Sequence, residues 1–376
     1  MEFYFVYSSG GGAGDWGGID RIFRNSMPEY FKNHILLKFG DIFFNHRSSA
    51  SIIKPSLWRT VDDAKAWIIG NTHDASIRTY QDMIMDVGTT KIVSYITSAQ
   101  ENISAMQLIA RFNRIMDDEG ILDKYSKIIL NSDIKNAVTF DIPNLFKVRS
   151  QMGNVSRDLF KEGNCKQELI DACARFANYT YNSTGKDPDR LLTIINLSWA
   201  NNDVDYYLGK LNYTPTKIAI GGAAFFNRGE MGAELRRMNS HIDFGAFKKV
   251  HFLGCGGQER AAIIKRSLGN NHSFSVDNTT PYNRAIDGSV DGRTQSGYFD
   301  YRSGSLYRIM PSTRNEILSL HESAVNMGIA CFSMHEMQTI IDGILQHQSK
   351  NSSQYTYECR AKLIIHNFDV FRYLAQ

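Results

Sequence analysis

Three aspartates each follow a short apolar run in this sequence, at or one residue past the apolar part. Asp86 closes "MIMD", Asp141 follows "AVTF", and Asp277 closes "SFSVD". Where parallel strands end at the same mouth of a barrel, such side chains meet. Carboxylates that meet can act as a nucleophile and as a general acid or base. Alternatively, each aspartate only begins a turn or caps a helix; for the three together we favour a site.

A second candidate site lies in the N-terminal stretch "FYFVYSSGGGAGDWGGID". Gly12, Gly14 and Gly17 match G-x-G-x-x-G directly after an expected strand, and Asp41 follows the next one. This is the pattern of a dinucleotide-binding fold, which leaves a nucleotide-binding oxidoreductase as an alternative. Pro28 interrupts the helix that this motif requires. We therefore interpret the stretch first as a surface loop that packs on a substrate.

The elements that would position these residues alternate between strands and helices. Helical periodicity covers 98–120, with Ile103, Met106, Ile109 and Phe112 on one face, and recurs over 166–181 and from 232 onward. Such alternation is typical of parallel sheet with helical crossovers, and the strand number fits a (β/α)₈ barrel; a doubly wound sheet is the alternative. Strands are expected at 3–7, 35–40, 66–70, 83–88, 137–142, 191–197, 217–222, 249–254 and 273–277.

The chain is predicted to divide into a catalytic barrel over 1–330 and a short helical C-terminal extension over 331–376, packed on the barrel. Its composition, 43% hydrophobic and 22% charged residues, is that of a globular protein. Five cysteines without a C-x-x-C pair predict reduced thiols and a cytoplasmic location. No apolar run reaches the length of a membrane span, so no membrane partner is expected. A homodimer is left open.

The strand ends, taken together, resemble the tRNA-guanine transglycosylase superfamily. The segments "MIMDVGTTKIVSY", "AVTFDIPN", "IAIGGAAF", "VHFLGCGG" and "SFSVDNTTPYNRAIDG" occur in its order and approximate spacing, over roughly residues 80 to 340. They look most like the DNA-guanine transglycosylases, pentosyltransferases that insert 7-deazaguanines into phage or bacterial DNA. The resemblance implies a (β/α)₈ barrel and base exchange through a covalent aspartyl-sugar intermediate. It implies a free base such as 7-cyano-7-deazaguanine as a partner, and no cofactor.

The resemblance also implies a role for individual residues. Asp277 matches the nucleophile, and Asp86 matches the general acid/base near the base nitrogen. Val87 stands where family members usually have a serine, which keeps open an inactive nucleic-acid-binding relative. The positions expected to contact the base are Asp141, Asn196, Gly221, Gly222, Gly88 and Thr89.

One departure from the family concerns metal binding. The tRNA-modifying bacterial members carry a C-x-C-x-x-C zinc cluster completed by a histidine, whereas residues 287–330 contain no cysteine here. Cys331, His335 and Cys359 are the remaining weak candidates, and we expect no zinc. The missing cluster, together with the lack of a recognisable RNA-binding domain, favours double-stranded DNA as the substrate. Action on tRNA is the alternative.

A stretch rich in arginine, "YRSGSLYRIMPSTRN", agrees with a nucleic-acid partner. Its arginines stand among Tyr301 and Tyr307 with no acid, a pattern that suits phosphates and stacked bases; a solvated loop is the alternative. A duplex target must be flipped out, and an aromatic residue of the Gly-rich loop is expected to fill the gap. The residues expected to contact nucleic acid are Arg284, Arg302, Arg308, Arg314 and Trp16.

Overall fold

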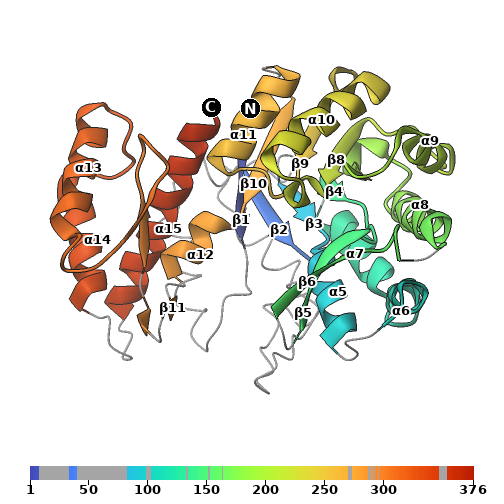
Figure 1. Cartoon of the computed structure of the whole chain (residues 1–376), viewed down its shortest axis with the longest axis horizontal. Helices are drawn as coiled ribbons and strands as arrows, with labels where there is room; N and C mark the ends of the chain where they lie inside the picture. Colours follow the sequence, from blue (N-terminus) through green and yellow to red (C-terminus); the bar gives the residue numbers. More distant parts are fainter. Residues whose placement is uncertain are drawn as a thin grey trace.

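A closed barrel of eight parallel strands forms the centre of the protein (Figure 1). The strands follow one another around the ring in chain order, and β10 pairs with β1 to close it. This confirms the predicted (β/α)₈ type of fold over the doubly wound alternative. The barrel strands are β1 (Glu2–Tyr7), β2 (Ile35–Lys38), β3 (Ile84–Asp86), β4 (Asn136–Val138), β7 (Leu191–Asn196), β8 (Lys217–Gly221), β9 (Lys249–Phe252) and β10 (Phe274–Asn278).

The computed structural model describes most of the chain. The described residues are 1–7, 34–39, 83–98, 103–132, 134–150, 153–162, 164–269, 273–286, 289–290, 293–294, 296–346 and 354–376. The strand expected at 66–70 and the Gly-rich stretch with Gly12, Gly14, Gly17, Pro28 and Asp41 lie outside these residues.

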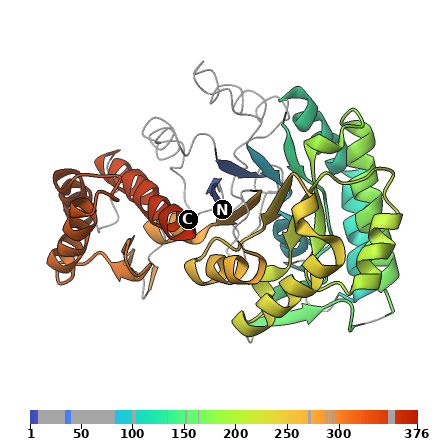
Figure 2. The same cartoon turned by 90° about the horizontal axis from the view of Figure 1, so that it is seen from above.

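Helices cover the outside of the barrel (Figure 2). The helix expected over 98–120 begins later, at Ala105, because Ser104 caps its start with a capping box that it forms with Gln107. Met106 was wrongly placed on the buried face: it is 51% exposed, whereas Leu108 and Phe112 are buried. The outer helices are α5 (Thr89–Ser98), α6 (Ala105–Asp118), α7 (Ile121–Asn131), α8 (Lys166–Ser183), α9 (Asn201–Gly209), α10 (Arg228–Ile242) and α11 (Gln258–Leu268), with short 3₁₀ turns η1 (Pro188–Arg190), η2 (Ala223–Phe225) and η3 (Phe244–Ala246).

Side chains of the barrel strands alternate between the interior and the outer helices. A compact apolar cluster fills the interior, and its members are Tyr4, Val6, Leu36, Ile84, Val138, Leu192, Ile194 and Ala219. The side chain two residues after a member of this cluster on the same strand points to the interior again. Lys38 on β2, Asp86 on β3 and Gly221 on β8 therefore face inward at the C-terminal mouth. On β10, Phe274 and Val276 belong to the outer core, so Asp277 also faces inward.

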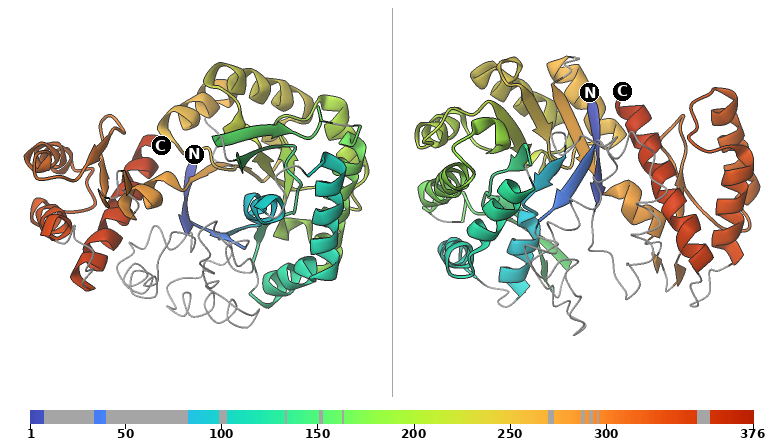
Figure 3. Two further views of the ribbon diagram at one scale, coloured as in Figure 1. Left: turned by 60° about the horizontal axis from the view of Figure 1, so that its bottom comes forward. Right: turned by 180° about the vertical axis from the view of Figure 1, so that it is seen from behind.

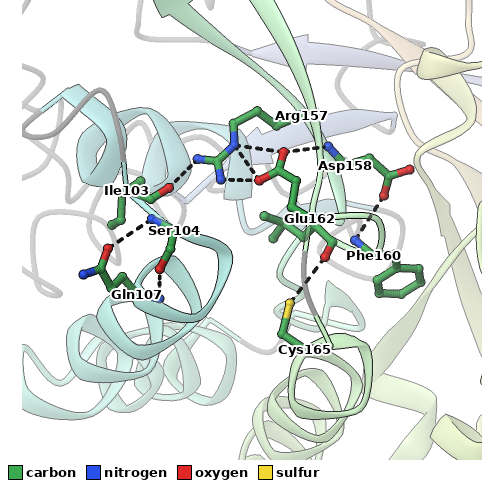
Figure 4. Close-up of polar contacts among 9 residues, drawn as sticks. Ile103, Ser104, Gln107, Arg157, Asp158, Phe160, Glu162 and Cys165 are labelled. Carbon is green, nitrogen blue, oxygen red and sulfur yellow. Dashed lines mark hydrogen bonds and ion pairs between the residues drawn. The ribbon is translucent and has the colours of Figure 1, made fainter.

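A β-hairpin that the sequence analysis did not predict follows β4. It consists of β5 (Leu145–Ser150) and β6 (Gly153–Asp158), paired antiparallel. Arg157 fixes the base of the hairpin: its guanidinium pairs with Glu162 and donates a hydrogen bond of 2.8 Å to the carbonyl of Ile103, just before α6 (Figure 4). The hairpin is thereby tied both to the chain that follows it and to the outer helical layer.

The last elements form a lobe beside the barrel and then return to it (Figure 3). Helix α15 packs against β1 and α11, and Phe368 on it contacts Phe3 and Phe5. It thus covers the barrel where β10 meets β1. In the described part of the chain, no helix is long and apolar enough to cross a membrane. The elements are α12 (Thr280–Ile286), β11 (Ser289–Val290), β12 (Arg293–Thr294), β13 (Gly297–Phe299), β14 (Leu306–Arg308), α13 (Arg314–Asn326), α14 (Met334–Gln346) and α15 (Gln354–Ala375).

Candidate functional site

The three aspartates noted in the sequence lie together at the C-terminal mouth of the barrel. Asp86 is the last residue of β3, Asp277 is near the end of β10, and Asp141 follows β4. Their charges act on one another. Asp277 contributes to the raised pKa of Asp86, and Asp86 contributes to that of Asp141. The structure therefore assembles a carboxylate-lined mouth from strands that are far apart in the sequence.

The surroundings of Asp86 favour its protonated form. Burial raises the pKa of its carboxyl group, and the negative charge of Asp277 raises it further. This shift is opposed most strongly by the cation of Lys38, which pairs with Asp86 in the register of β2 and β3, and also by the backbone N–H of Gly88. A carboxyl group balanced in this way can both release and accept a proton.

Lys38 was not singled out in the sequence. Leu36 lies in the interior cluster, so the period of two in "ILLK" would have placed Lys38 inside the mouth once the strand bounds were known.

Asp141 is buried, with a side chain fixed by a threonine. Thr89, at the start of α5, donates a hydrogen bond of 2.9 Å from Oγ1 to Asp141 Oδ1. Burial raises the pKa of Asp141 to about 7, although the hydrogen bond from Thr89 acts in the opposite direction. Asp141 is therefore ionised only near or above neutral pH. Thr89, expected to contact a base, contacts this carboxylate.

Asp277 has one carboxylate oxygen tied to the protein. Oδ1 accepts a hydrogen bond of 2.7 Å from the backbone N–H of Gly254 and lies 3.2 Å from Nε2 of His251. Among the described residues, Oδ2 has no hydrogen-bond partner. The backbone is also fixed, because the N–H of Gly256 donates to the carbonyl of Asp277 at 2.8 Å. Asp277 thus presents a free oxygen from a rigid mount.

His251, on β9, was not predicted as a site residue. Its ring is fully buried, and Nδ1 lies 3.0 Å from Oγ of Ser275. The alternation of "KVHFL" in β9 could have indicated that His251 faces the barrel interior. His251 shares this inward face with Ala219 and Ser275 on the neighbouring strands.

Asn196 and Gly222 form the side of the mouth next to β7 and β8. Asn196 Oδ1 accepts a hydrogen bond of 3.1 Å from the backbone N–H of Ser198, which fixes the orientation of the amide. Within the described part of the chain, its Nδ2 donates no hydrogen bond. A Cβ on Gly222 would lie 2.2 Å from Asn196 Oδ1, and Gly222 has φ +75°. Only glycine fits there without displacing Asn196.

Arg237 on α10 supports the loop that follows Asn196. Its guanidinium donates hydrogen bonds to the carbonyls of Leu197 (3.1 Å) and Trp199 (2.8 Å) and to Oδ1 of Asn201 (2.5 Å). A cavity of about 470 Å³ lies here, lined by residues 198–202, Glu234 and Arg237. None of the three aspartates lines this cavity.

The residues expected to contact nucleic acid differ in their surroundings. Arg314 pairs with Asp342 through two hydrogen bonds of 2.5 and 2.8 Å, which occupy its guanidinium. Arg284, Arg302 and Arg308 are exposed, and Trp16 lies outside the described residues. The suggestion that Tyr301 stacks on a base is wrong: its ring is buried.

The candidate metal ligands do not converge in the described structure. His335 is exposed on α14, and Cys359 Sγ contacts the carbonyl of Thr339 at 3.8 Å. Cys331 donates its backbone N–H to the hydroxyl of Tyr301 at 3.2 Å. Among the described residues, no group of three or more His, Cys, Asp or Glu side chains is arranged to bind a metal ion.

No protein-family model matches this sequence, and no curated protein matches it. Its function is therefore argued from the residues at the mouth of the barrel.

Proposed function

We propose that this protein is a base-exchange transglycosylase that replaces guanine in double-stranded DNA by a 7-deazaguanine. The observation that carries the proposal is the pairing of two unlike carboxylates at one mouth. Asp277 receives N–H donors on one oxygen and leaves the other free, whereas Asp86 has a raised pKa. Two carboxylates whose environments separate their protonation states are the arrangement used for double displacement at a sugar carbon.

In the first displacement, Asp277 Oδ2 forms a bond to C1′ of the target nucleotide as the bond from C1′ to guanine N9 breaks. The electron pair of that bond stays on guanine, and protonated Asp86 supplies the proton that neutralises it. The sugar is then held as an ester of Asp277. The developing positive charge at C1′ is stabilised by the carboxylate that traps it.

In the second displacement, the incoming 7-deazaguanine takes the place of guanine. Ionised Asp86 accepts the proton from N9 of the new base, whose electron pair forms the bond to C1′ and releases the Asp277 carboxylate. Ionised Asp141 accepts hydrogen bonds from the N–H groups of a guanine-like edge, and Asn196 Nδ2 is available as a donor. The reaction neither gains nor loses atoms and calls for no redox partner.

The preference for DNA rests on exposed arginines and on the sequence. Arg284, Arg302 and Arg308 are exposed cations suited to phosphates. The target must leave the duplex to bring C1′ to Asp277, at a cost of a few kcal/mol that contacts to the flipped base offset. Trp16 remains our candidate for filling the vacated space.

The test is transfer of a radiolabelled 7-cyano-7-deazaguanine into duplex DNA or, separately, into tRNA. Wild type is compared with Asp277→Asn, which keeps the shape of the side chain, and with Asp118→Asn, which removes an exposed charge on α6. We expect label in DNA with wild type and Asp118→Asn only. Label in tRNA alone would keep the chemistry and overturn the substrate. No label in either would refute the proposal.

A further inference from the structure

We infer that His251 is a positioning residue that aims the Asp277 carboxylate, and that Ser275 sets the tautomer in which it does so. This inference rests on the proposed function and adds to it a residue that does not touch the substrate. It is carried by a chain of three buried side chains, Ser275 to His251 to Asp277, with contacts of 3.0 and 3.2 Å.

The position of His251 fits a support and not a reacting group. The ring is fully buried beneath Asp277, whose own side chain is 6% exposed. Tyr4 of β1 packs edge-on against it, with the ring centroids 5.5 Å apart. Ser275 and Asp277 lie two residues apart on the inward face of β10, so they reach the two nitrogens of one imidazole on β9. The strands themselves thereby fix the ring.

The protons of this chain can be assigned from its chemistry. An ionised carboxylate only accepts hydrogen bonds, so Nε2 of His251 must carry the proton directed at Asp277 Oδ1. In a neutral imidazole, Nδ1 then has a lone pair, and the hydroxyl of Ser275 is the donor that satisfies it. In the opposite tautomer, the lone pair of Nε2 would face the carboxylate of Asp277. Nδ1 would then carry a proton, and the Ser275 hydroxyl could not donate to it.

The consequence concerns which oxygen of Asp277 reacts. Gly254 N–H and His251 Nε2–H both bind Oδ1, which fixes the rotation of the carboxylate and leaves Oδ2 for C1′. Without His251, the Gly254 contact alone would allow the carboxylate to turn. Alignment of the attacking atom is worth large factors in rate because a near-attack geometry must be held.

One test reads the tautomer directly and does not depend on activity. In wild type labelled with ¹⁵N-histidine, long-range ¹H–¹⁵N spectra separate protonated from unprotonated ring nitrogens, and His251→Gln identifies the signal. We expect His251 with Nε2 protonated and Nδ1 unprotonated, and a changed Nδ1 signal in Ser275→Ala. A protonated Nδ1, with or without a proton on Nε2, would overturn the inference.

The second test measures formation of the covalent adduct in a single turnover on duplex DNA. His251→Phe keeps an aromatic ring but removes the donor, and we expect a loss of roughly 10- to 100-fold, the range seen for residues that orient a metal ligand. His251→Gln retains an N–H donor and should recover part of that rate. DNA affinity should stay within about twofold, because His251 lies below the mouth.

The matched control is His241→Phe, which removes a histidine that contacts Asp205 Oδ1 at 2.7 Å on the outer surface. This variant should react as wild type does. If wild type forms adduct and His251→Phe and Ser275→Ala form it at the same rate, the inference fails while the proposed function stands. If wild type forms no adduct, the proposed function fails, and the role of His251 fails with it.

Discussion

Replacing Asp141 by asparagine should make the folded protein more stable at pH 8 while abolishing base binding. Asp141 is buried, and its pKa is raised from 3.8 to about 7. The folded state therefore binds a proton between these two values that the unfolded chain has released. Stability falls as the pH rises from about 4 to 7, and above pH 7 the ionised group costs its full amount.

The size of the effect follows from the shift. At about 1.4 kcal/mol for each pH unit, a change from 3.8 to about 7 corresponds to at most roughly 4 kcal/mol at pH 8. At pH 5, where the folded wild type keeps the proton, the same relation gives a loss of stability of roughly 2 kcal/mol. For a chain of 376 residues, an unfolding entropy of about 0.8 kcal/mol/K converts these values to gains in Tm of about 5 °C and about 2 °C.

The assay is thermal unfolding of wild type and Asp141→Asn at pH 5 and pH 8, followed by circular dichroism. Asparagine keeps an oxygen that can accept the hydrogen bond from Thr89 and carries no charge, so the packing is preserved. Asp118→Asn, on the exposed face of α6, controls for the loss of one negative charge. An equal gain in Tm at both pH values, or no gain at pH 8, would show that burial does not raise the pKa of Asp141.

Three further predictions concern base recognition. If ionised Asp141 accepts the N–H groups of the base, affinity for 7-cyano-7-deazaguanine should fall about tenfold for each pH unit below about 7, and a flat profile in calorimetric titrations would contradict this role. Gly222→Ala should lower the same affinity at least about tenfold because its Cβ would displace Asn196. Gly269→Ala, with a similar φ of +78° and no atom of the described residues within 4 Å of its Cβ, should share only the backbone cost of about 1–2 kcal/mol. Arg237→Lys, which cannot keep the fork of hydrogen bonds to the loop after Asn196, should weaken base binding roughly tenfold, whereas the neighbouring Arg236→Lys should bind as wild type does.

The barrel was predictable because its apolar runs are separated by helical periodicity and end in recognisable residues. The strands at Asp86 and Asp277 were found for this reason. The β5–β6 hairpin was not, because "LFKVRSQMGNVSRD" mixes basic, polar and apolar residues without a clear period, and its base is fixed by Arg157 and Glu162. Met106 was misplaced because the helix begins only after Ser104, and its buried face runs through Ala105, Leu108 and Phe112.

The arrangement of the candidate site could be predicted from the sequence only in part. The aspartates can be recognised in the sequence because they end apolar runs. His251 and Lys38, in contrast, are single polar residues inside strands. Whether such a residue faces the interior depends on the register between neighbouring strands, for example Lys38 opposite Asp86, and register is a property of the folded barrel. The role of Ser275 depends further on which nitrogen of His251 it reaches.

The packing of α15 over the junction of β1 and β10 bears on how the protein is made. Phe3 and Phe5 on β1 are covered by Phe368, and β1 completes its pairing only with β10, so this strand depends on partners that are synthesised much later than it is. Closing so long a loop slows folding and leaves apolar strand surface available to chaperones in the meantime. Asp86 lies on β3, which is synthesised early, and Asp277 lies on β10, which closes the barrel against β1. A nascent chain that stops before β10 therefore lacks Asp277, and one that stops before α15 leaves the junction of β1 and β10 uncovered.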